Sequence, residues 1–223
     1  MLNRTLISTL FMLIGLTVRA DLIVNGSFEQ ASVNPGATFV ELSGGSTAIT
    51  GWTVTGNTID YIGGYWQHSL GQRSIDLSGS NAGGIEQTFA TTVGQAYTVL
   101  FDLAGNPQGA PTIKTVEVSV AGQQQNFTFD TTGKSFTDMG WTTKTLNFTA
   151  IGGLTTLSFT NRDVTQFGPT LDNVRVNLAV VPEPASLITL GVGAVGLMAY
   201  AWHRRMNPTH KTSLQQNKAS CGG

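Results

Sequence analysis

Cysteine is almost absent from this sequence, which has only Cys221 among its 223 residues. The part of the chain before it therefore contains no disulfide, no thiolate metal site and no cysteine nucleophile. Histidine is scarce too: His68 is the sole histidine between residues 21 and 180, which excludes a site built from several histidines. Charged residues make up 11% of the chain, against about 25% in average proteins. Uncharged polar residues must carry most of the surface, as in many extracellular β domains.

Positive charge is the scarcer sign in the middle of the chain. Residues 21–181 contain six basic and twelve acidic residues, a formal charge of −6, although the whole chain sums to −1. A surface of that sign repels phosphate backbones. We therefore expect no nucleic-acid partner.

Recognisable catalytic motifs are also missing. No Gly-x-Ser-x-Gly nucleophile motif occurs. Glu86 and Asp102 could in principle form a glycosidase pair, but Glu86 alternates with apolar residues, as an outward strand residue does. Asp102 lies inside the apolar run 99–103, where a buried carboxylate would need hydrogen bonds or a cation. The sequence therefore predicts no catalytic residues and a protein that is not an enzyme.

The first twenty residues have the pattern of a secretory signal peptide. Arg4 precedes the apolar run 6–18, and the small residue Ala20 suits cleavage before Asp21. An uncleaved anchor is the alternative, but the run is short for a membrane span. The pattern predicts export and processing by signal peptidase.

A second apolar run, residues 187–202, contains no charge and follows two prolines that no strand or helix passes through. As a helix it would extend about 24 Å, somewhat less than the ~30 Å hydrocarbon core. Arg204 and Arg205 then supply the positive flank of the cytoplasmic side. A buried core helix is the alternative, but its three glycines suit a membrane helix better. We expect a C-terminal transmembrane helix.

This region resembles the sorting tail of PEP-CTERM proteins, which Gram-negative bacteria that make exopolysaccharide secrete. The resemblance rests on the motif and the basic pair, Val181, Pro182, Glu183, Pro184, Arg204 and Arg205. It implies an exosortase partner that cuts at the motif, an inner-membrane-tethered intermediate, and a final place at the cell surface or in the extracellular matrix. Residues 206–223 depart from the family by adding a polar tail, which we expect to be disordered.

Between these ends, residues 21–180 read as a single β domain with room for a core. Short alternating segments recur between clusters of Gly, Asn and Pro. Ala121-Gly122 and Gly152-Gly153 have the pattern of hairpin turns. The predicted strands are Leu22–Val24, Ser27–Gln30, Thr38–Leu42, Gly51–Thr55, Ile59–Ile62, Ser74–Leu77, Gly84–Ala90, Ala96–Ala104, Lys114–Ala121, Gln124–Phe129, Thr142–Ala150, Thr155–Asn161 and Thr170–Leu178. Unequal strands and long loops favour an all-β, two-sheet sandwich over a barrel.

The order of several short motifs in this domain resembles the choice-of-anchor C family and the wider galactose-binding-like jelly rolls of carbohydrate-binding modules. The motifs are residues 21–29, Gly51-Trp52, 74–77, 84–89 and 171–174. The resemblance implies a jelly-roll sandwich whose first and last strands meet. Related modules bind a structural calcium there, so it also implies a Ca²⁺ site at Glu29 and Asp172. The alternative has Glu29 solvated and Asp172 only shaping a bulge.

The loop 61–68 holds the densest group of aromatic and amide side chains. Sugar rings stack on Tyr or Trp while a few polar groups bond the hydroxyls, and this combination is the general pattern of a ligand site. The predicted ligand residues are Tyr65, Trp66, Gln67, His68 and Arg73. The alternative has Tyr61 and Trp66 closing over the core and His68 exposed. Trp52 and Trp141 each follow a glycine and are predicted to lie in the core.

These observations together predict an exported, non-catalytic binding module for polysaccharide of the envelope or matrix. One alternative is a purely structural surface or matrix protein without a discrete ligand. The other is a glycan hydrolase.

Overall fold

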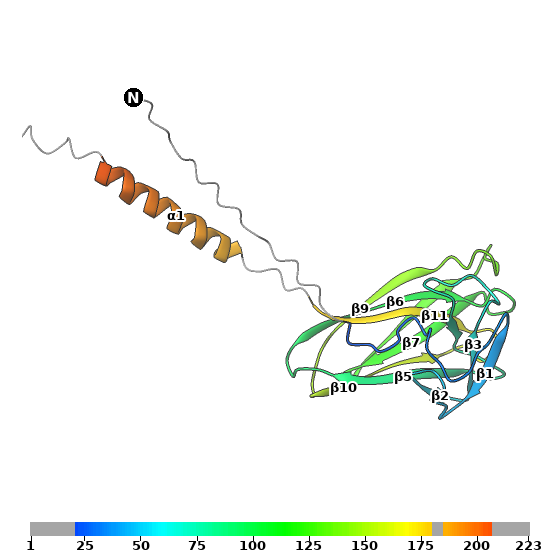
Figure 1. Ribbon diagram of the computed structural model, residues 1–223. Coiled ribbons are helices and arrows are strands. Elements are labelled where there is room, and N and C mark those ends of the chain that lie inside the picture. Colours follow the sequence, from blue (N-terminus) through cyan, green and yellow to red (C-terminus); the bar gives the residue numbers. More distant parts are fainter. Residues whose placement is uncertain (1–20, 180–184, 207–223) are drawn as a thin grey trace, which may run out of the picture. The chain divides into compact units, whose positions relative to one another are not determined.

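The computed structural model describes residues 21–179 and 185–206 (Figure 1). The predicted signal peptide, the motif residues Val181–Pro184 and nearly all of the polar tail lie outside these described residues. The chain divides at residues 179 and 180 into two units, of which the first contains the sheets and the second the helix α1. Each unit is described by itself.

Within residues 21–179, eleven strands pair antiparallel in two sheets. The six-stranded sheet has the order β1-β3-β4-β11-β6-β9 and the five-stranded sheet the order β2-β5-β10-β7-β8. The strands are β1 (Phe39–Ser43), β2 (Thr53–Gly56), β3 (Thr58–Ile62), β4 (Ser74–Asp76), β5 (Gly83–Ala90), β6 (Ala96–Gly105), β7 (Ile113–Val120), β8 (Gln123–Asp130), β9 (Thr142–Thr149), β10 (Leu154–Asn161) and β11 (Pro169–Leu178).

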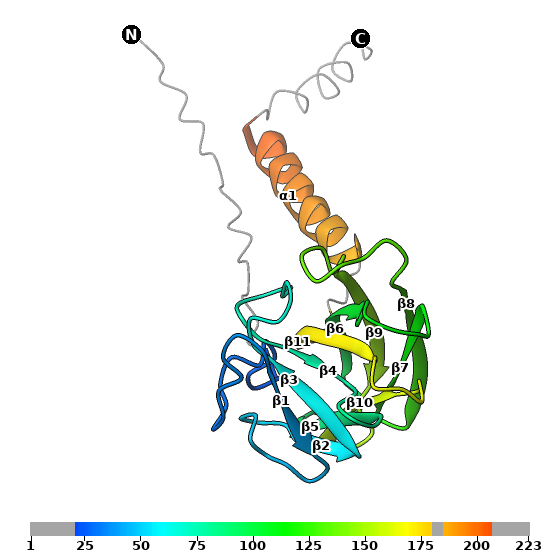
Figure 2. The same ribbon diagram turned by 90° about the vertical axis from the view of Figure 1, so that its right-hand side faces the viewer.

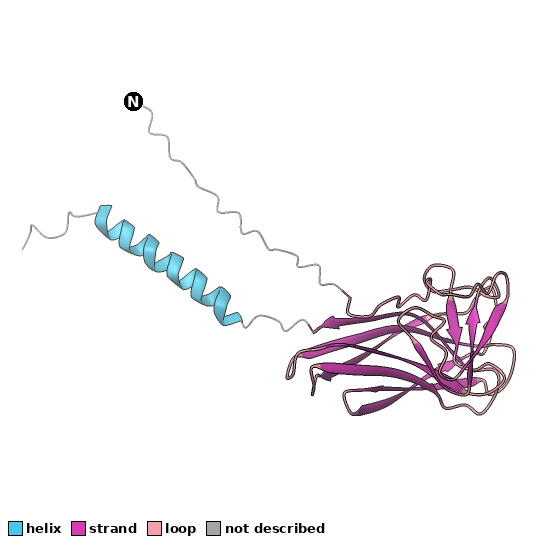
Figure 3. Ribbon diagram, turned by 60° about the horizontal axis from the view of Figure 1, so that its bottom comes forward, coloured by secondary structure: helices cyan, strands magenta, loops and turns pink. Residues whose placement is uncertain are grey.

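The two sheets lie face to face, which gives the predicted all-β jelly-roll sandwich (Figure 3). Apolar residues alternate along the strands and fill the space between the sheets. Phe101 of the six-stranded sheet and Phe159 of the five-stranded sheet meet there, with ring centroids 5.1 Å apart. Both rings are fully buried, and each such burial stabilises the fold by roughly 1.5–3 kcal/mol. Trp52 is buried as predicted, whereas Trp141 is only partly buried against the core.

The two strands predicted at the start of the domain are absent from residues 21–38. Residues 22–27 form turns instead, with left-handed backbone at Asn25 and Phe28 (φ 55° and 61°). Two hydrogen bonds, Leu22 N to Val176 O and Val174 N to Gly26 O, still hold the segment beside β11. The apolar residues of this segment suggested strands. In the structure they pack into the core from turns, and the ring centroid of Phe28 lies 5.4 Å from that of Trp52.

The two predicted hairpin turns have different outcomes. Ala121 and Gly122 both have positive φ, at 50° and 78°, and join the paired strands β7 and β8 as predicted. Gly152-Gly153 connects β9 to β10, which belong to different sheets. The prediction of a hairpin there was wrong, because paired glycines permit a turn without deciding which strands pair.

The second unit contains the helix α1 (Ala185–Met206). It includes the apolar run and Arg205, so the predicted helix is confirmed. Its predicted role as a membrane span is not, because no helix in the described residues is both long enough and apolar enough to cross a membrane.

Candidate functional site

The outward face of the six-stranded sheet carries a row of polar side chains across four neighbouring strands. Glu41 of β1 lies opposite Asp60 of β3, Asp60 opposite Asp76 of β4, and Asp76 opposite Thr170 of β11. Residues directly opposite on paired strands point to the same side of a sheet. The neighbours of Asp60, Ile59 and Tyr61, are buried in the core. The row therefore lies on the side of the sheet away from the core, and Figure 2 shows the four strands side by side.

Asp76 is buried and fully bonded. It accepts hydrogen bonds from Asn106 Nδ2 at 2.8 Å, Ser78 N at 3.0 Å and Gly168 N at 3.1 Å. Burial raises its pKa to about 8, against the opposing effect of these donors. The carboxyl thus holds two loops, 106–108 and 165–168, onto the strand end.

Asp60 has a different environment. Its Oδ1 is buried and has no hydrogen-bond partner among the described residues. Burial raises its pKa to about 7, and the charge of Glu41 adds to this. Glu41 itself accepts a hydrogen bond from Ser80 N, and hydrogen bonds to Ser80 lower its pKa. The pKa values of these two adjacent carboxyls are therefore shifted in opposite directions.

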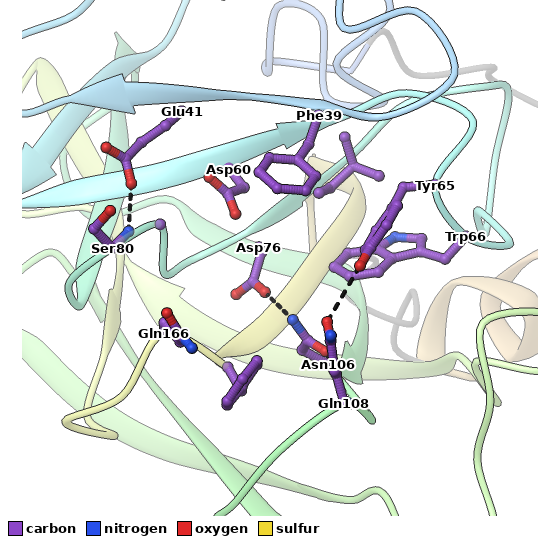
Figure 4. A pocket seen from close by; sticks show the side chains of 13 residues that line it. Phe39, Glu41, Asp60, Tyr65, Trp66, Asp76, Ser80, Asn106, Gln108 and Gln166 are labelled. Atoms are coloured by element: carbon purple, nitrogen blue, oxygen red, sulfur yellow. Dashed lines mark hydrogen bonds between the residues drawn. The ribbon is translucent and has the colours of Figure 1, made fainter.

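These residues line a cavity of about 320 Å³, shown in Figure 4. One wall is aromatic: Tyr65 packs against Phe39 at 5.3 Å and against Trp66 at 5.6 Å between ring centroids. Amides face this wall, and the Tyr65 hydroxyl donates to Gln108 Oε1 at 3.2 Å. The lining consists of Phe39, Glu41, Asp60, Ile62, Tyr65, Trp66, Asp76, Gly79, Ser80, Asn106, Gln108, Gln166 and Phe167. Such a combination of apolar faces and a few polar groups can stack a ring and bond its hydroxyls.

Of the five predicted ligand residues, the structure brings Tyr65 and Trp66 into this cavity. Trp66 is 5% exposed, and its Nε1 donates to Ser74 Oγ at 2.9 Å. Trp66 therefore supports the wall of the cavity and leaves little of its ring free for a ligand. This is close to the alternative in which Trp66 closes over the core. Tyr61, the other residue of that alternative, is buried and donates to Phe28 O.

The other three predicted residues lie outside the lining and bond to other parts of the protein. Gln67 Oε1 accepts a hydrogen bond from Met139 N at 2.9 Å. Arg73 donates to Gln72 O at 2.7 Å. His68 is half-buried with Nδ1 3.0 Å from Ser74 Oγ, and burial lowers the pKa of His68. A ligand role for these three stays a prediction.

The cavity residues missed from the sequence come from five separate segments, so no local cluster marks them. Phe39 and Glu41 alternate along β1, and Gln108 and Gln166 lie in distant loops. One signal was present: Asp60 and Asp76 each sit among apolar strand residues, as Asp102 does. An acidic residue inside an apolar strand indicates an outward face that something covers.

Asp102 and Asp172 lie opposite each other on β6 and β11, on the same outward face. Asp102 accepts hydrogen bonds from Thr143 Oγ1 at 2.6 Å, Asn173 Nδ2 at 2.9 Å and the Ser69 hydroxyl. The predicted requirement for hydrogen bonds is therefore met. Glu86 belongs to β5 of the other sheet, so it cannot form a glycosidase pair with Asp102.

The two predicted calcium ligands, Glu29 and Asp172, accept hydrogen bonds from different amides of the loop 69–72. Asp172 Oδ2 accepts from the amides of Ser69 at 2.9 Å and Leu70 at 2.8 Å, and its Oδ1 from Asn173 N at 2.6 Å. Glu29 Oε1 accepts from Gln72 N at 2.7 Å. N–H donors thus occupy both carboxyl oxygens of Asp172 and one of Glu29, and no group of three acidic, His or Cys side chains that could hold a metal occurs among the described residues. Calcium at Glu29 and Asp172 stays a prediction.

Two family models match the chain. The model described as "Protein of unknown function (DUF642)" matches residues 21–177. The PEP-CTERM protein-sorting motif matches residues 180–205, which confirms the resemblance seen in the sequence. That motif indicates export and surface sorting in Gram-negative bacteria, with processing by an exosortase.

Halomucin of Haloquadratum walsbyi is 32% identical over 177 residues, which is 77% of this chain. The chain spans about 2% of the length of that relative. A structure of a family 61 carbohydrate-binding module in complex with β-1,4-galactotriose is 13% identical, with 72% of this chain and 99% of that chain covered and a TM-score of 0.48. A family 35 carbohydrate-binding module from Clostridium thermocellum is 13% identical, with 63% and 99% covered and a TM-score of 0.42. At these values the two structures are similar in fold alone.

Proposed function

Because this chain belongs to the DUF642 family and carries a PEP-CTERM protein-sorting motif, we propose that it is an exported, non-catalytic module that binds polysaccharide of the cell surface or matrix. The binding site is the cavity on the outward face of the six-stranded sheet. Calcium is not part of this proposal.

The observation that carries the proposal is the pairing of an aromatic wall with a polar floor in one cavity. Phe39 and Tyr65 offer ring faces, while Gln108, Gln166 and the carboxyls offer hydrogen-bonding groups. A volume of about 320 Å³ is at the small end of the ~300–1,000 Å³ typical of ligand sites. We therefore expect about one or two sugar rings to enter, with the rest of the polymer outside.

The test is affinity electrophoresis of the purified full chain through gels that contain soluble polysaccharides. We expect at least one polysaccharide to retard the protein, and Phe39→Ala or Tyr65→Ala to abolish the retardation. Phe39 is 42% exposed, so its removal leaves the fold intact. Ile113→Ala is the matched control, because Ile113 is 48% exposed and lies outside the cavity.

Retardation that survives both cavity variants would place the ligand elsewhere. A protein that no polysaccharide retards would support the structural alternative, in which the domain has no discrete ligand.

A hydrolase is the second candidate, and one observation favours it. Glu41 and Asp60 lie opposite each other, and the pKa of Glu41 is lowered while that of Asp60 is raised to about 7. Glycosidases pair a charged and a protonated carboxyl in this way. Release of reducing ends from a retarding polysaccharide, lost in Glu41→Gln and in Asp60→Asn, would support hydrolysis. We expect no release.

A further inference from the structure

The lining of the cavity has an unbalanced charge. It contains three carboxyls, of Glu41, Asp60 and Asp76, and none of its thirteen residues is Lys, Arg or His. A basic side chain close to this group is Lys114, which is buried and interacts with Asp76 and Asp163. Its Nζ donates to Gly109 O and Phe167 O, both at 2.7 Å. Lys114 therefore offsets Asp76 from behind and leaves Glu41 and Asp60 without a cation.

Asp60 also lacks a hydrogen-bond donor, which is an observation separate from charge. Its Oδ1 is buried and unpartnered among the described residues. Buried polar atoms in folded proteins nearly always have a partner in the protein, in water or in a ligand. The side chain points into the cavity between Phe39 and Asp76 (Figure 4). Because Oδ1 itself is closed to solvent, a donor brought by a ligand would meet Oδ2, the other oxygen of this half-buried carboxyl.

We infer that the glycan bound in this cavity consists of amino sugars with free amino groups, whose ammonium group bonds to Asp60 between Glu41 and Asp76. This inference rests on the proposed function and adds the substrate class. The sugar ring stacks on Phe39 and Tyr65, and its hydroxyls bond to Gln108 and Gln166. The carboxyls disfavour uronic acids by repulsion between like charges, and an N-acetyl group carries no positive charge and is bulkier than an ammonium.

Two other cationic ligands fit less well. A divalent ion needs several oxygen ligands at once, and the described residues contain no group of three acidic, His or Cys side chains that could hold one. A lysine side chain would satisfy Asp60 but has no ring for the aromatic wall, where Tyr65 contacts Phe39 at 5.3 Å and Phe136 at 4.8 Å. The amino sugar uses both walls.

The proton affinity of the site agrees with a cationic ligand. Burial and the charge of Glu41 raise the pKa of Asp60 to about 7, and burial raises that of Asp76 to about 8, with the charge of Asp60 adding to it. An ammonium beside these groups favours their charged forms. A cationic ligand in the cavity would therefore lower the raised pKa values of Asp60 and Asp76.

The experiment measures binding of three tetrasaccharides to the full chain by titration calorimetry at near-neutral pH and low salt. The probes are β-1,4-linked glucosamine, its fully N-acetylated counterpart and cellotetraose. We expect the glucosamine oligomer to bind at least about tenfold more tightly than the other two. Asp60→Asn should reduce that preference at least tenfold, whereas Glu86→Gln, a carboxyl removed from the open face of the other sheet, should leave it unchanged.

Several outcomes overturn the inference. Equal affinity for the three probes, or a preference that survives Asp60→Asn, removes the amino-sugar assignment but leaves the proposed function standing. Binding of a tetralysine peptide as tight as that of the glucosamine oligomer, or loss of all binding with EDTA, replaces the ligand by a peptide or a metal-bridged one. If no polysaccharide in the gel series retards the folded wild-type protein, the proposed function itself fails.

Discussion

The two outward faces of this sandwich follow the same alternating sequence pattern and have opposite surroundings. On the five-stranded sheet, outward residues such as Thr88 and Thr156 are exposed, and Glu86 is partly exposed. On the six-stranded sheet, the outward residues Asp76 and Asp172 are fully or almost fully buried. Alternation in the sequence indicates which side chains point away from the core, but it does not indicate whether loops cover them.

The difference comes from loops that polar side chains hold in place. Asp172 binds the amides of Ser69 and Leu70, and Asp76 binds Asn106 and Gly168. These bonds form between segments far apart in the sequence. The covered face thus gains a cavity and carboxyls of raised pKa, while the open face has ordinary solvated side chains.

The largest effect should follow removal of the Asp76 carboxyl. Asp76→Ala leaves the donors of Asn106, Ser78 and Gly168 buried without an acceptor, and we expect the free energy of unfolding to fall by roughly 3–5 kcal/mol. The control on the open face, Glu86→Ala, should change it by no more than about 0.5 kcal/mol. Urea denaturation measures both. A loss below about 1 kcal/mol for Asp76→Ala would mean that this face is not closed.

The second test removes Lys114, the buried cation behind the cavity. Lys114→Met keeps most of the buried stem but leaves Gly109 O and Phe167 O without their donor. We expect a loss of about 1–3 kcal/mol in urea denaturation. Lys144→Met, on the edge strand β9, is the matched control and should be nearly neutral. Equal effects of the two variants would contradict the description of Lys114.

The third test uses pH. In the folded state the pKa values of Asp60 and Asp172 are about 7 and that of Asp76 about 8, against about 3.9 in an unfolded chain. Between pH 4 and pH 8 the folded state therefore binds more protons, so its stability falls as pH rises. At about 1.4 kcal/mol per pKa unit these three shifts set an upper bound of roughly 9 kcal/mol on the loss between pH 5 and pH 8, and the lowered pKa of His68 opposes it. We expect a net loss of at least about 1 kcal/mol. Asp60→Asn should reduce this slope, and stability that rises over this range would refute the sign.

The smallest effect is expected on the open face. Thr88 and Thr156 share a hydrogen bond of 2.7 Å across β5 and β10 while exposed to solvent. Thr88→Ala should lower the free energy of unfolding by only about 0.5 kcal/mol. Thr143→Ala, which removes a donor to buried Asp102, should have a clearly larger effect in the same assay. Equal losses in the free energy of unfolding for the two variants would mean that the two faces do not differ in burial.

Local chemistry made much of the fold predictable. The strand alternation around Leu157 and Phe159, the positive-φ turn at Ala121-Gly122 and the buried Trp52 each depend on neighbours in the sequence. The strands predicted within residues 22–30 were wrong, because apolar side chains can pack against the core from a turn as well as from a strand. Gly152-Gly153 was misjudged because sheet partners are chosen by distant contacts.

The candidate site was only partly predictable for the same reason. Tyr65 and Trp66 stand together in the sequence and lie together in the cavity. Phe39, Asp60 and Gln166 come together only through strand register and loop packing. The one local sign of them was a carboxylate inside an apolar strand, noticed for Asp102 and equally present at Asp60 and Asp76.

The most direct measurement is backbone-amide NMR on the labelled full chain during titration with fragments of whichever polysaccharide retards it most strongly. The account predicts shift changes confined to residues 39–41, 60–66, 76–80, 106–108 and 166–167, with none on β5 or β10. Changes along β5 and β10, with the cavity residues unmoved, would contradict it.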